Sequence, residues 1–234
     1  MFQNIFSLIY GSTIPSANKL DGPTIRPASI SDLDRIAEVA VKGFPDDPEF
    51  DYRFPHRLEY PQDHFKWVRE EYKEYLEQTE KFSVVVVTTK DATTTREDTV
   101  ISLAVWDMDN SIASRGGDLG LNERRDVNKA HYTEYLATLE RGRLEYFSKY
   151  GNEQYHLWLL VTHPDFRKRG AGTMLCRWGM EKATEQSYMT TVLGSPMGTL
   201  LYEYLGFKLV GFVTAHVEGE EEKVDVSCLE YKKD

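Results

Sequence analysis

Hydrophobic residues recur along this chain at two spacings, one typical of strands and one typical of helices. The β-branched run 82–88 is too short to favour a helix and predicts a buried strand, and residues 100–106 predict a second strand that pairs with it as a hairpin. Apolar residues at helical spacing predict a helix over 129–149, which Gly151 ends, and a charged, aromatic helix is predicted over 63–77. The polar segments between these elements predict a turn at 91–98 and a surface loop at 111–128.

The first part of the chain contains a short strand, a capped helix and a proline-rich stretch. Residues 24–26 predict the strand, and Ser31 with Asp34 three residues later predicts the start of an amphipathic helix. Residues 1–23 are predicted to be an N-terminal extension that packs on the domain or frays. The stretch after the first helix is broken into turns and short pieces by Pro45, Pro48, Pro55 and Pro61.

The last third of the chain alternates strands with helices. Residues 155–161 carry bulky side chains on both faces, which predicts a central strand that Pro164 ends. Together these elements predict an α/β fold with one mixed central sheet flanked by helices, in a single domain over residues 24–234. The remaining predicted elements are helices at 171–186 and 197–204, strands at 189–193, 207–217 and 224–231, and an acidic turn at 218–222.

Composition narrows the classes of protein. The formal net charge of −10 disfavours a nucleic-acid-binding protein, because no overall basic field attracts phosphates. Two cysteines make neither a disulfide framework nor a set of metal ligands, so no metal is expected. The apolar stretch 1–10 lacks a basic flank and is interrupted by polar residues, so we expect no membrane partner and a cytoplasmic location.

A local basic segment stands out in this acidic chain. Arg167, Lys168 and Arg169 lie between the predicted central strand and the next helix, followed by Gly170 and Gly172. A helix N-terminus presents unpaired N–H groups and a partial positive charge, and glycines let the backbone approach a ligand closely. The segment predicts a pyrophosphate site without a metal, or alternatively a solvated helix cap. It lacks the Gly-Lys-Ser/Thr ending of a P-loop and the three spaced glycines of a dinucleotide fold.

Two motifs carry a resemblance to a known family. The Arg-x-x-Gly-x-Gly pattern from Arg167 to Gly172, and the segment 201–207 with its Leu-Tyr-x-x-x-Gly-Phe pattern, resemble the signatures of the GNAT superfamily of acyl-CoA-dependent N-acetyltransferases. The resemblance covers about 24–231 and is specific at about 155–212; the longer N-terminal half is similar to that of fungal small-molecule members. It implies a GNAT-like fold in which two parallel strands splay around a cofactor cleft.

The resemblance also implies how the donor, acetyl-CoA, binds. The backbone of the segment Leu160, Val161 and Thr162 would bond the acetyl carbonyl and the pantetheine arm, chiefly through its first and last residues. Ser195 stands where many relatives have a pantetheine-contacting asparagine, and alternatively caps the following helix. The pyrophosphate would lie on backbone amides of the next segment, assisted by the Arg167 side chain, and the implied residues there are Arg167, Lys168, Arg169, Gly170, Ala171, Gly172 and Thr173.

Tyr202 and His156 are the candidate catalytic residues. Tyr202 matches the family's general acid, which would protonate the departing thiolate; its alternative role is packing alone. An alkyl ammonium is almost wholly protonated at neutral pH, so the amine needs a base. His156 lies where some relatives have a catalytic glutamate, with Glu153 and Asp107 as competitors and a core role as the alternative.

The resemblance implies direct attack by the amine within a ternary complex, with no cysteine nucleophile. The predicted partner is a small-molecule amine acceptor, and the chain is expected to be a monomer or a homodimer. Aromatic residues at 44–60, Trp67 and Trp106 would either shape the acceptor pocket or pack in the core. The alternatives are acetylation of a protein N-terminus or lysine, and a non-catalytic acyl-CoA-binding module.

Overall fold

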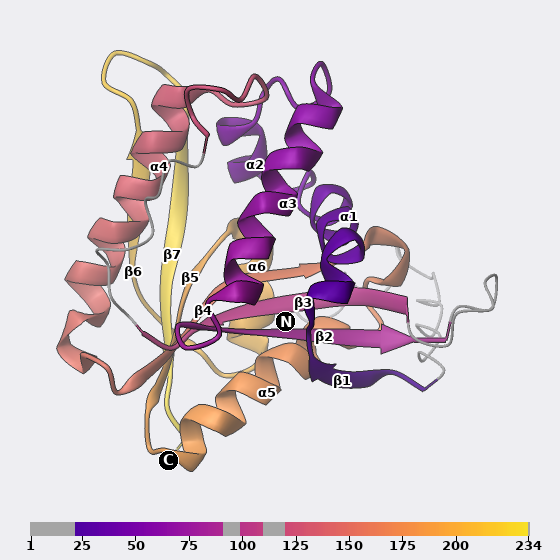
Figure 1. Cartoon of the computed structure of the whole chain (residues 1–234). Helices are drawn as coiled ribbons and strands as arrows, with labels where there is room; N and C mark the ends of the chain where they lie inside the picture. Colours follow the sequence, from indigo (N-terminus) through magenta and orange to yellow (C-terminus); the bar gives the residue numbers. More distant parts are fainter. Residues whose placement is uncertain (1–21, 91–98, 110–119, 234) are drawn as a thin grey trace, which may run out of the picture.

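One mixed sheet of seven strands organises the protein (Figure 1). The computed structural model describes residues 22–90, 99–109 and 120–233. The strands lie in the order β1-β2-β3-β4-β5-β7-β6; β4 and β5 run parallel, and all other neighbours run antiparallel. Their bounds are β1 Thr24–Pro27, β2 Phe82–Thr89, β3 Thr99–Asp107, β4 Gln154–Thr162, β5 Met189–Gly194, β6 Lys208–His216 and β7 Lys223–Tyr231.

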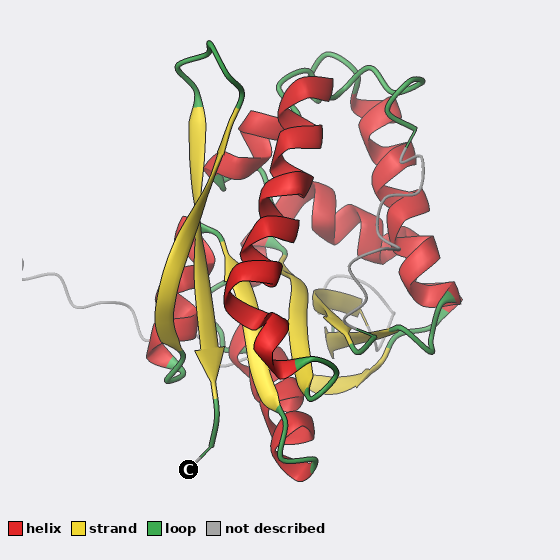
Figure 2. Cartoon of the chain, turned by 90° about the vertical axis from the view of Figure 1, so that its left-hand side faces the viewer, coloured by secondary structure: helices red, strands yellow, loops and turns green. Residues whose placement is uncertain are grey.

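Helices cover both faces of this sheet, which Figure 2 shows from the side of α4. Helices α1 and α3 pack on one face, α4 lies over β6 and β7, and α5 and α6 pack on the other face. No helix in the described part of the chain is long and apolar enough to cross a membrane. The helices are α1 Leu33–Gly43, α2 Pro48–Arg53, α3 Pro61–Glu77, α4 Lys129–Gly142, α5 Ala171–Glu185 and α6 Pro196–Tyr204.

The predicted α/β architecture is confirmed, with β4 as the central strand and β2–β3 as a hairpin. Two local predictions are wrong. The first helical segment is capped by Ser29, whose backbone N–H donates to Asp32 at 2.8 Å, rather than by Ser31 with Asp34. The helix predicted over 129–149 ends at Gly142 and continues as a π-helical and then a 3₁₀ turn. The predicted extension (except residues 22–23), the turn at 91–98 and the first half of the loop at 111–128 lie outside the described residues.

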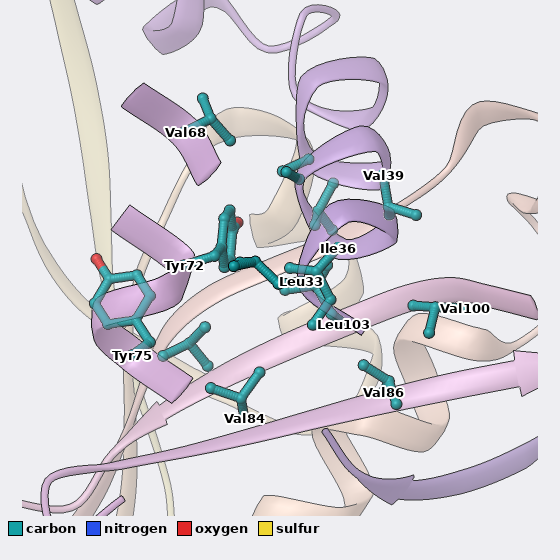
Figure 3. Close-up of a cluster of buried hydrophobic side chains, with 14 of the residues drawn as sticks. Leu33, Ile36, Val39, Val68, Tyr72, Tyr75, Val84, Val86, Val100 and Leu103 are labelled. Carbon is teal, nitrogen blue, oxygen red and sulfur yellow. The ribbon is translucent and has the colours of Figure 1, made fainter. Parts of the chain in front are cut away.

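The core on the α1–α3 face consists mostly of aliphatic side chains from two helices and three strands, together with Tyr72, Tyr75 and Phe82 (Figure 3). Leu33 and Ile36 of α1 meet Leu103 of β3, all 3 % exposed or less. Each such side chain contributes roughly 1.5–3 kcal/mol by leaving water. Gly43, at the end of α1, lies so close to β4 that a Cβ there would be 2.3 Å from Val161 Cγ2. This contact fixes α1 against the strand that carries the candidate site.

Strand β4 is irregular at two neighbouring points. Its register against β3 shifts so that Leu157 pairs with Trp106 and Leu159 with Val105, which leaves Trp158 as an inserted residue. Its pairing with β5 covers four residues and ends at Leu157. Beyond that residue β4 runs on to Thr162 without β5 beside it, so the two parallel strands splay as predicted.

Candidate active site

The basic segment before α5 forms a compact cradle. A 3₁₀ turn at Pro164–Phe166 leads into Lys168 with φ 58° and Gly170 with φ 91°, and Gly170 caps α5. The left-handed conformation favours glycine, and a Cβ at Gly170 would meet nothing within 4 Å, so the space beside it is open. The first helical amides, those of Ala171, Gly172 and Thr173, have no intrahelical acceptor. The cradle therefore offers N–H donors and the positive end of a helix dipole to an anion.

The side chains of this segment point in different directions. Lys168 and Arg169 are exposed beside the cradle, and the Arg169 guanidinium lies 5.6 Å from the centre of the Phe166 ring. Arg167 instead donates to the Asp46 carboxylate and to backbone carbonyls, one of them that of Thr162 at 3.4 Å. The Arg167 guanidinium thus ties the cradle to the α1–α2 connection, which leaves the backbone amides of the cradle as donors for an anion.

The free edge of β4 leads from this cradle into the sheet. The His163 N–H donates to the Ile101 carbonyl of β3 at 2.9 Å. Because peptide groups alternate sides along a strand, Val161 also points its N–H and C=O to β3, whereas the peptide groups of Leu160 and Thr162 point to the side of the splayed gap. The Thr162 carbonyl on that side also accepts from Arg167 Nε at 3.4 Å. The gap edge therefore comprises the two residues predicted to bond the cofactor through their backbones. Val161 faces away from it, with its carbonyl bonded by Ser102 and its side chain packed under α1.

Two polar side chains near the gap have partners within the fold. The Thr162 hydroxyl lies 2.8 Å from that of Ser102, which explains why a polar residue is accepted at this point of a central strand. The Ser195 hydroxyl accepts from the Gly198 N–H at 3.2 Å and so caps α6. The capping role considered for Ser195 is thus present, and a pantetheine contact stays a prediction.

Tyr202 lies at the inner end of α6, 6 % exposed, within the cluster that joins α5 to the sheet. Two glycines make room for its ring: a Cβ would be 3.1 Å from the ring at Gly194, and 2.9 Å from the ring and 3.2 Å from the hydroxyl at Gly198. Burial, and next the nearby Cys176, raise the pKa of Tyr202 well above its usual value, so the hydroxyl keeps its proton at neutral pH. Tyr204, by contrast, is 77 % exposed.

His156 is buried on β4 and held by a directed chain of hydrogen bonds. The Gln154 amide donates to the carbonyls of Phe147 and Gly151, so its oxygen is the atom that accepts from Thr191 at 2.9 Å. The Thr191 proton is thereby committed, and the Thr191 oxygen must accept from His156 Nδ1–H, 2.9 Å away. This assigns the proton of neutral His156 to Nδ1 and the basic lone pair to Nε2.

The other residues considered for a chemical role lie in less suitable surroundings than His156 and Tyr202. Asp107 forms a buried ion pair with Arg143 at 2.8 Å, and Glu153 is exposed before β4. Burial raises the pKa of the Cys176 thiol to about 12, so this cysteine is no thiolate nucleophile at neutral pH. His163 Nδ1 accepts from the Asp165 N–H at 3.3 Å in the turn, a structural role. No group of residues in the described ranges is arranged to hold a metal ion.

A cavity opens beside His156 on the α3–α4 side of the sheet, with a volume of about 80 Å³. His156 and Leu159 of β4 and Leu193 of β5 line it on the side of the sheet. Aromatic and charged side chains from four elements also line it: Glu49 and Arg53 from α2, Glu71, Glu74 and Tyr75 from α3, Tyr132 and Tyr135 from α4, and Trp158 from β4. The cavity is therefore placed to receive an acceptor next to the candidate base.

One family match includes β4, the cradle and Tyr202, whereas the parts of the cavity that come from α2, α3 and α4 lie outside it. Residues 141–207, from the end of α4 through the cradle to Phe207 after α6, match the model of the acetyltransferase (GNAT) family. Over these residues the chain matches a GNAT acetyltransferase domain. A fungal protein named acetyltransferase, from Stachybotrys chartarum, is 25% identical over 217 residues, which cover 89% of this chain and 90% of that protein. Both findings support an acyl-CoA-dependent N-acetyltransferase, as the sequence predicts.

Solved GNAT structures share the fold of this domain at low sequence identity. An agmatine N-acetyltransferase superposes with a TM-score of 0.63 at 12% identity, covering 91% of this chain and 100% of that one. A mosquito arylalkylamine N-acetyltransferase-like protein superposes with a TM-score of 0.56 at 14% identity, covering 91% of this chain and 100% of that one. The ribosomal-protein-S18-alanine N-acetyltransferase of Escherichia coli superposes with a TM-score of 0.54 at 11% identity, covering 90% of this chain and 94% of that one. These likenesses establish the GNAT fold.

Sequence reasoning did not identify the cavity beside His156. Of the aromatic residues considered for a pocket, Phe50, Phe54 and Trp106 are 4 % exposed or less and belong to the core. The cavity instead takes aromatic residues from α3, α4 and β4. Tyr132 and Tyr135 do recur at helical spacing, but that spacing does not say which element their face meets.

Proposed function

We propose that this protein transfers the acetyl group of acetyl-CoA to the amine of a small molecule. The observation that carries the proposal is the free edge of β4: Leu160 and Thr162 point their peptide groups into a gap that runs from the α5 cradle towards Tyr202 and His156. Bound acetyl-CoA supplies an activated thioester. The residues fit such a donor. The open space beside Gly170 and the unpaired amides at the start of α5 can bind its pyrophosphate, and the unpaired edge of β4 can hydrogen-bond the amide groups of its pantetheine arm.

The residues divide the proton transfers between the two sides of the gap. His156 Nε2 takes a proton from the acceptor ammonium, directly or through water, and the neutral nitrogen attacks the thioester carbonyl. A C–N bond forms, the C–S bond breaks, and the sulfur leaves with the bonding electron pair. Tyr202 gives a proton to that sulfur. The nitrogen loses its second proton through water as the amide forms, and this proton restores the Tyr202 hydroxyl, while His156 releases the first proton to solvent. We assign Tyr202 as general acid and His156 as base.

The small cavity favours a small acceptor over a polypeptide. A protein N-terminus or lysine needs an open groove for the chain around the amine, whereas the space beside His156 is enclosed by three helices and β4. A non-catalytic acyl-CoA-binding module would not need a buried tyrosine fitted between Gly194 and Gly198. Both alternatives predict no turnover with small amines.

The cofactor site is tested by thermal unfolding with acetyl-CoA, CoA and ATP. Ligand at ~100 times its dissociation constant stabilises the native state by about 2.7 kcal/mol, which raises the unfolding temperature measurably. Gly170→Glu should abolish the shift with both CoA species, since it places a carboxylate in the cradle. Gly219→Glu is the matched control, because Gly219 has φ 89° and equally open surroundings but lies in the β6–β7 turn. Absence of any CoA shift in the folded wild type, or an unchanged shift in Gly170→Glu, would overturn the cofactor assignment.

A further inference from the structure

The cavity beside His156 carries more negative than positive charge. Of the described residues that line it, Glu49, Glu71 and Glu74 are acidic, and Arg53 is the one arginine or lysine. Arg53 Nη2 lies 3.6 Å from Glu49 Oε1, so this guanidinium is directed to the first of the three carboxylates. The two glutamates of α3 have no cation within ion-pair distance among the described residues. The cavity is therefore electrostatically suited to a positively charged occupant.

Aromatic rings make the walls suitable for a cation as well. The Arg53 guanidinium already lies over the Tyr135 ring, 4.4 Å from its centre. Tyr75, Tyr132 and Trp158 present further rings to the same cavity. Ring faces attract cations by about 0.5–2 kcal/mol each, more strongly where water is excluded. The walls thus stabilise a cation without requiring a carboxylate at every point.

The acidic end of the cavity is held in a defined orientation relative to β4. Trp158 Nε1–H donates to the Tyr75 hydroxyl at 2.8 Å, and that hydroxyl donates to Glu71 Oε1 at 2.8 Å. Glu74 stands three residues after Glu71 on α3, so both carboxylates belong to one face of the helix. In Figure 3 the Tyr75 oxygen points away from the aliphatic cluster below α1, in keeping with this polar role. His156 lies at the β4 end of the cavity and the two carboxylates at the α3 end.

We propose that the acceptor is an amine with a second cationic group, which the carboxylates of Glu71 and Glu74 bind while the reacting nitrogen lies at His156. The proposal rests on the proposed function, since it names the acceptor class of that same site. Binding of the distal cation orients the acceptor, and its positive charge adds to that of Arg53 beside the two glutamates. Preference for such a tail should therefore depend on these two side chains and should be expressed mainly in KM.

The test compares three acceptors of equal chain length and different tail charge. Butylamine, 1,4-diaminobutane and 4-aminobutyrate carry an apolar, a cationic and an anionic tail, and free thiol release measures turnover with acetyl-CoA. We expect wild type to use the diamine at least ~10-fold better in kcat/KM than butylamine, and the amino acid least well. Glu71→Gln and Glu74→Gln together should reduce the diamine advantage to within ~3-fold. Gln at 71 still accepts from Tyr75, so the wall is preserved.

Glu70→Gln is the matched control on α3, because Glu70 is exposed and does not line the cavity. It should keep the full diamine advantage. Turnover of butylamine equal to the diamine in wild type, or a diamine advantage unaffected by the double substitution, would overturn the dicationic assignment while leaving the N-acetyltransferase intact. Absence of thiol release with every amine, from folded protein that binds acetyl-CoA, would instead overturn the proposed function and this inference with it.

Discussion

At the scale of single residues, the fit around Tyr202 is the tightest feature of the proposed reaction centre. Its ring lies between the α6 backbone at Gly198 and the β5 end at Gly194, where no Cβ can be added without displacing it. These close contacts on two sides hold the Tyr202 ring in a single position. Placement of an acid group to within an ångström matters to a proton transfer, because misplacement raises the barrier directly.

Gly198→Ala should therefore lower kcat through Tyr202. The added Cβ would lie 2.9 Å from the Tyr202 ring and 3.2 Å from its hydroxyl, so the ring must move. We expect kcat to fall ~10- to 100-fold, with the dissociation constant for acetyl-CoA nearly unchanged. Tyr202→Phe alone should lower kcat by ~10²-fold or more, as loss of a general acid does. Thiol-release kinetics with a saturating amine measure both.

The double variant separates a positioning effect from general damage. If Gly198 acts through the tyrosine hydroxyl, Gly198→Ala should cost less than ~3-fold in kcat when Tyr202 is already Phe. Equal costs in both backgrounds would refute this role of the glycine. Full activity of Tyr202→Phe would refute the general-acid assignment itself.

The sequence predicted the position of Tyr202 and not the partners of Arg167. The pattern at 201–207 distinguishes an inward tyrosine from the exposed Tyr204, because residues two apart on a helix face different directions. Arg167 donates to Asp46, 121 residues away along the chain. No local pattern encodes that pairing, since it depends on how α1 packs on β4. The hydrogen-bond chain from Gln154 to His156 is equally beyond local pattern, because it needs β5 beside β4.

At the scale of elements, a buried ionic cluster ties the segment before α4 to α3. The Asp126 carboxylate accepts from His64 Nδ1 at 2.6 Å and from the Arg124 guanidinium at 2.7 and 2.8 Å. The carboxylate of Asp126 is fully buried and the side chains of His64 and Arg124 are 3 % exposed. Burial alone would raise the pKa of Asp126, but the hydrogen bonds from Arg124 and His64 outweigh it and lower that pKa from 3.8 to about 2.

This cluster should make stability depend on pH in acid. Because the pKa of Asp126 is lower folded than unfolded, its contribution to the free energy of unfolding is present above about pH 4 and is lost as the pH falls toward 2. The shift corresponds to roughly 2 kcal/mol. Asp126→Asn, which does not titrate, should be less stable than wild type at pH 7, and the difference should shrink by about half of that amount at pH 3 and by most of it at pH 2. Urea unfolding of both proteins across this range measures it.

Asp51→Asn provides a matched comparison with an exposed carboxylate. Asp51 pairs with Arg57 at 2.6 Å, but its side chain is 67 % exposed, and such surface pairs contribute about 0–1 kcal/mol. The stability difference between this variant and wild type should be small at every pH. A difference for Asp126→Asn that stays constant from pH 7 to 2 would contradict the lowered pKa.

Regular elements were predictable from the sequence because each depends on a repeated local period. The strand at β2 and the helix at α3 follow from β-branched runs and helical spacing, and the structure has them nearly at the predicted bounds. The π-helical turn at Arg143–Phe147 was not predictable. There Arg143 reaches the buried Asp107 of β3, a tertiary contact that no spacing within the helix reveals.

At the scale of the whole molecule, the sheet consists of two parts joined by a short parallel contact. Strands β1 to β4 form one part and β5, β7 and β6 the other, and four residue pairs from Gln154 to Leu157 connect them. Beyond these pairs the parts diverge around the proposed cofactor gap. A donor in that gap would act as an additional strand and join both parts, which relates cofactor binding to the stability of the whole sheet.

Amide hydrogen exchange should reveal this arrangement as an alternation along β4. Without ligand, the amides of Leu160 and Thr162 point into the gap and should exchange at least ~10-fold faster than those of Val161 and His163, which point to β3. CoA should slow exchange at the first two and leave the others unchanged, because its pantetheine arm supplies acceptors along the gap. ATP, which has phosphates and no such arm, should protect neither. Uniform protection of all four amides in the free protein, or protection by ATP equal to that by CoA, would show that the arm does not lie along β4.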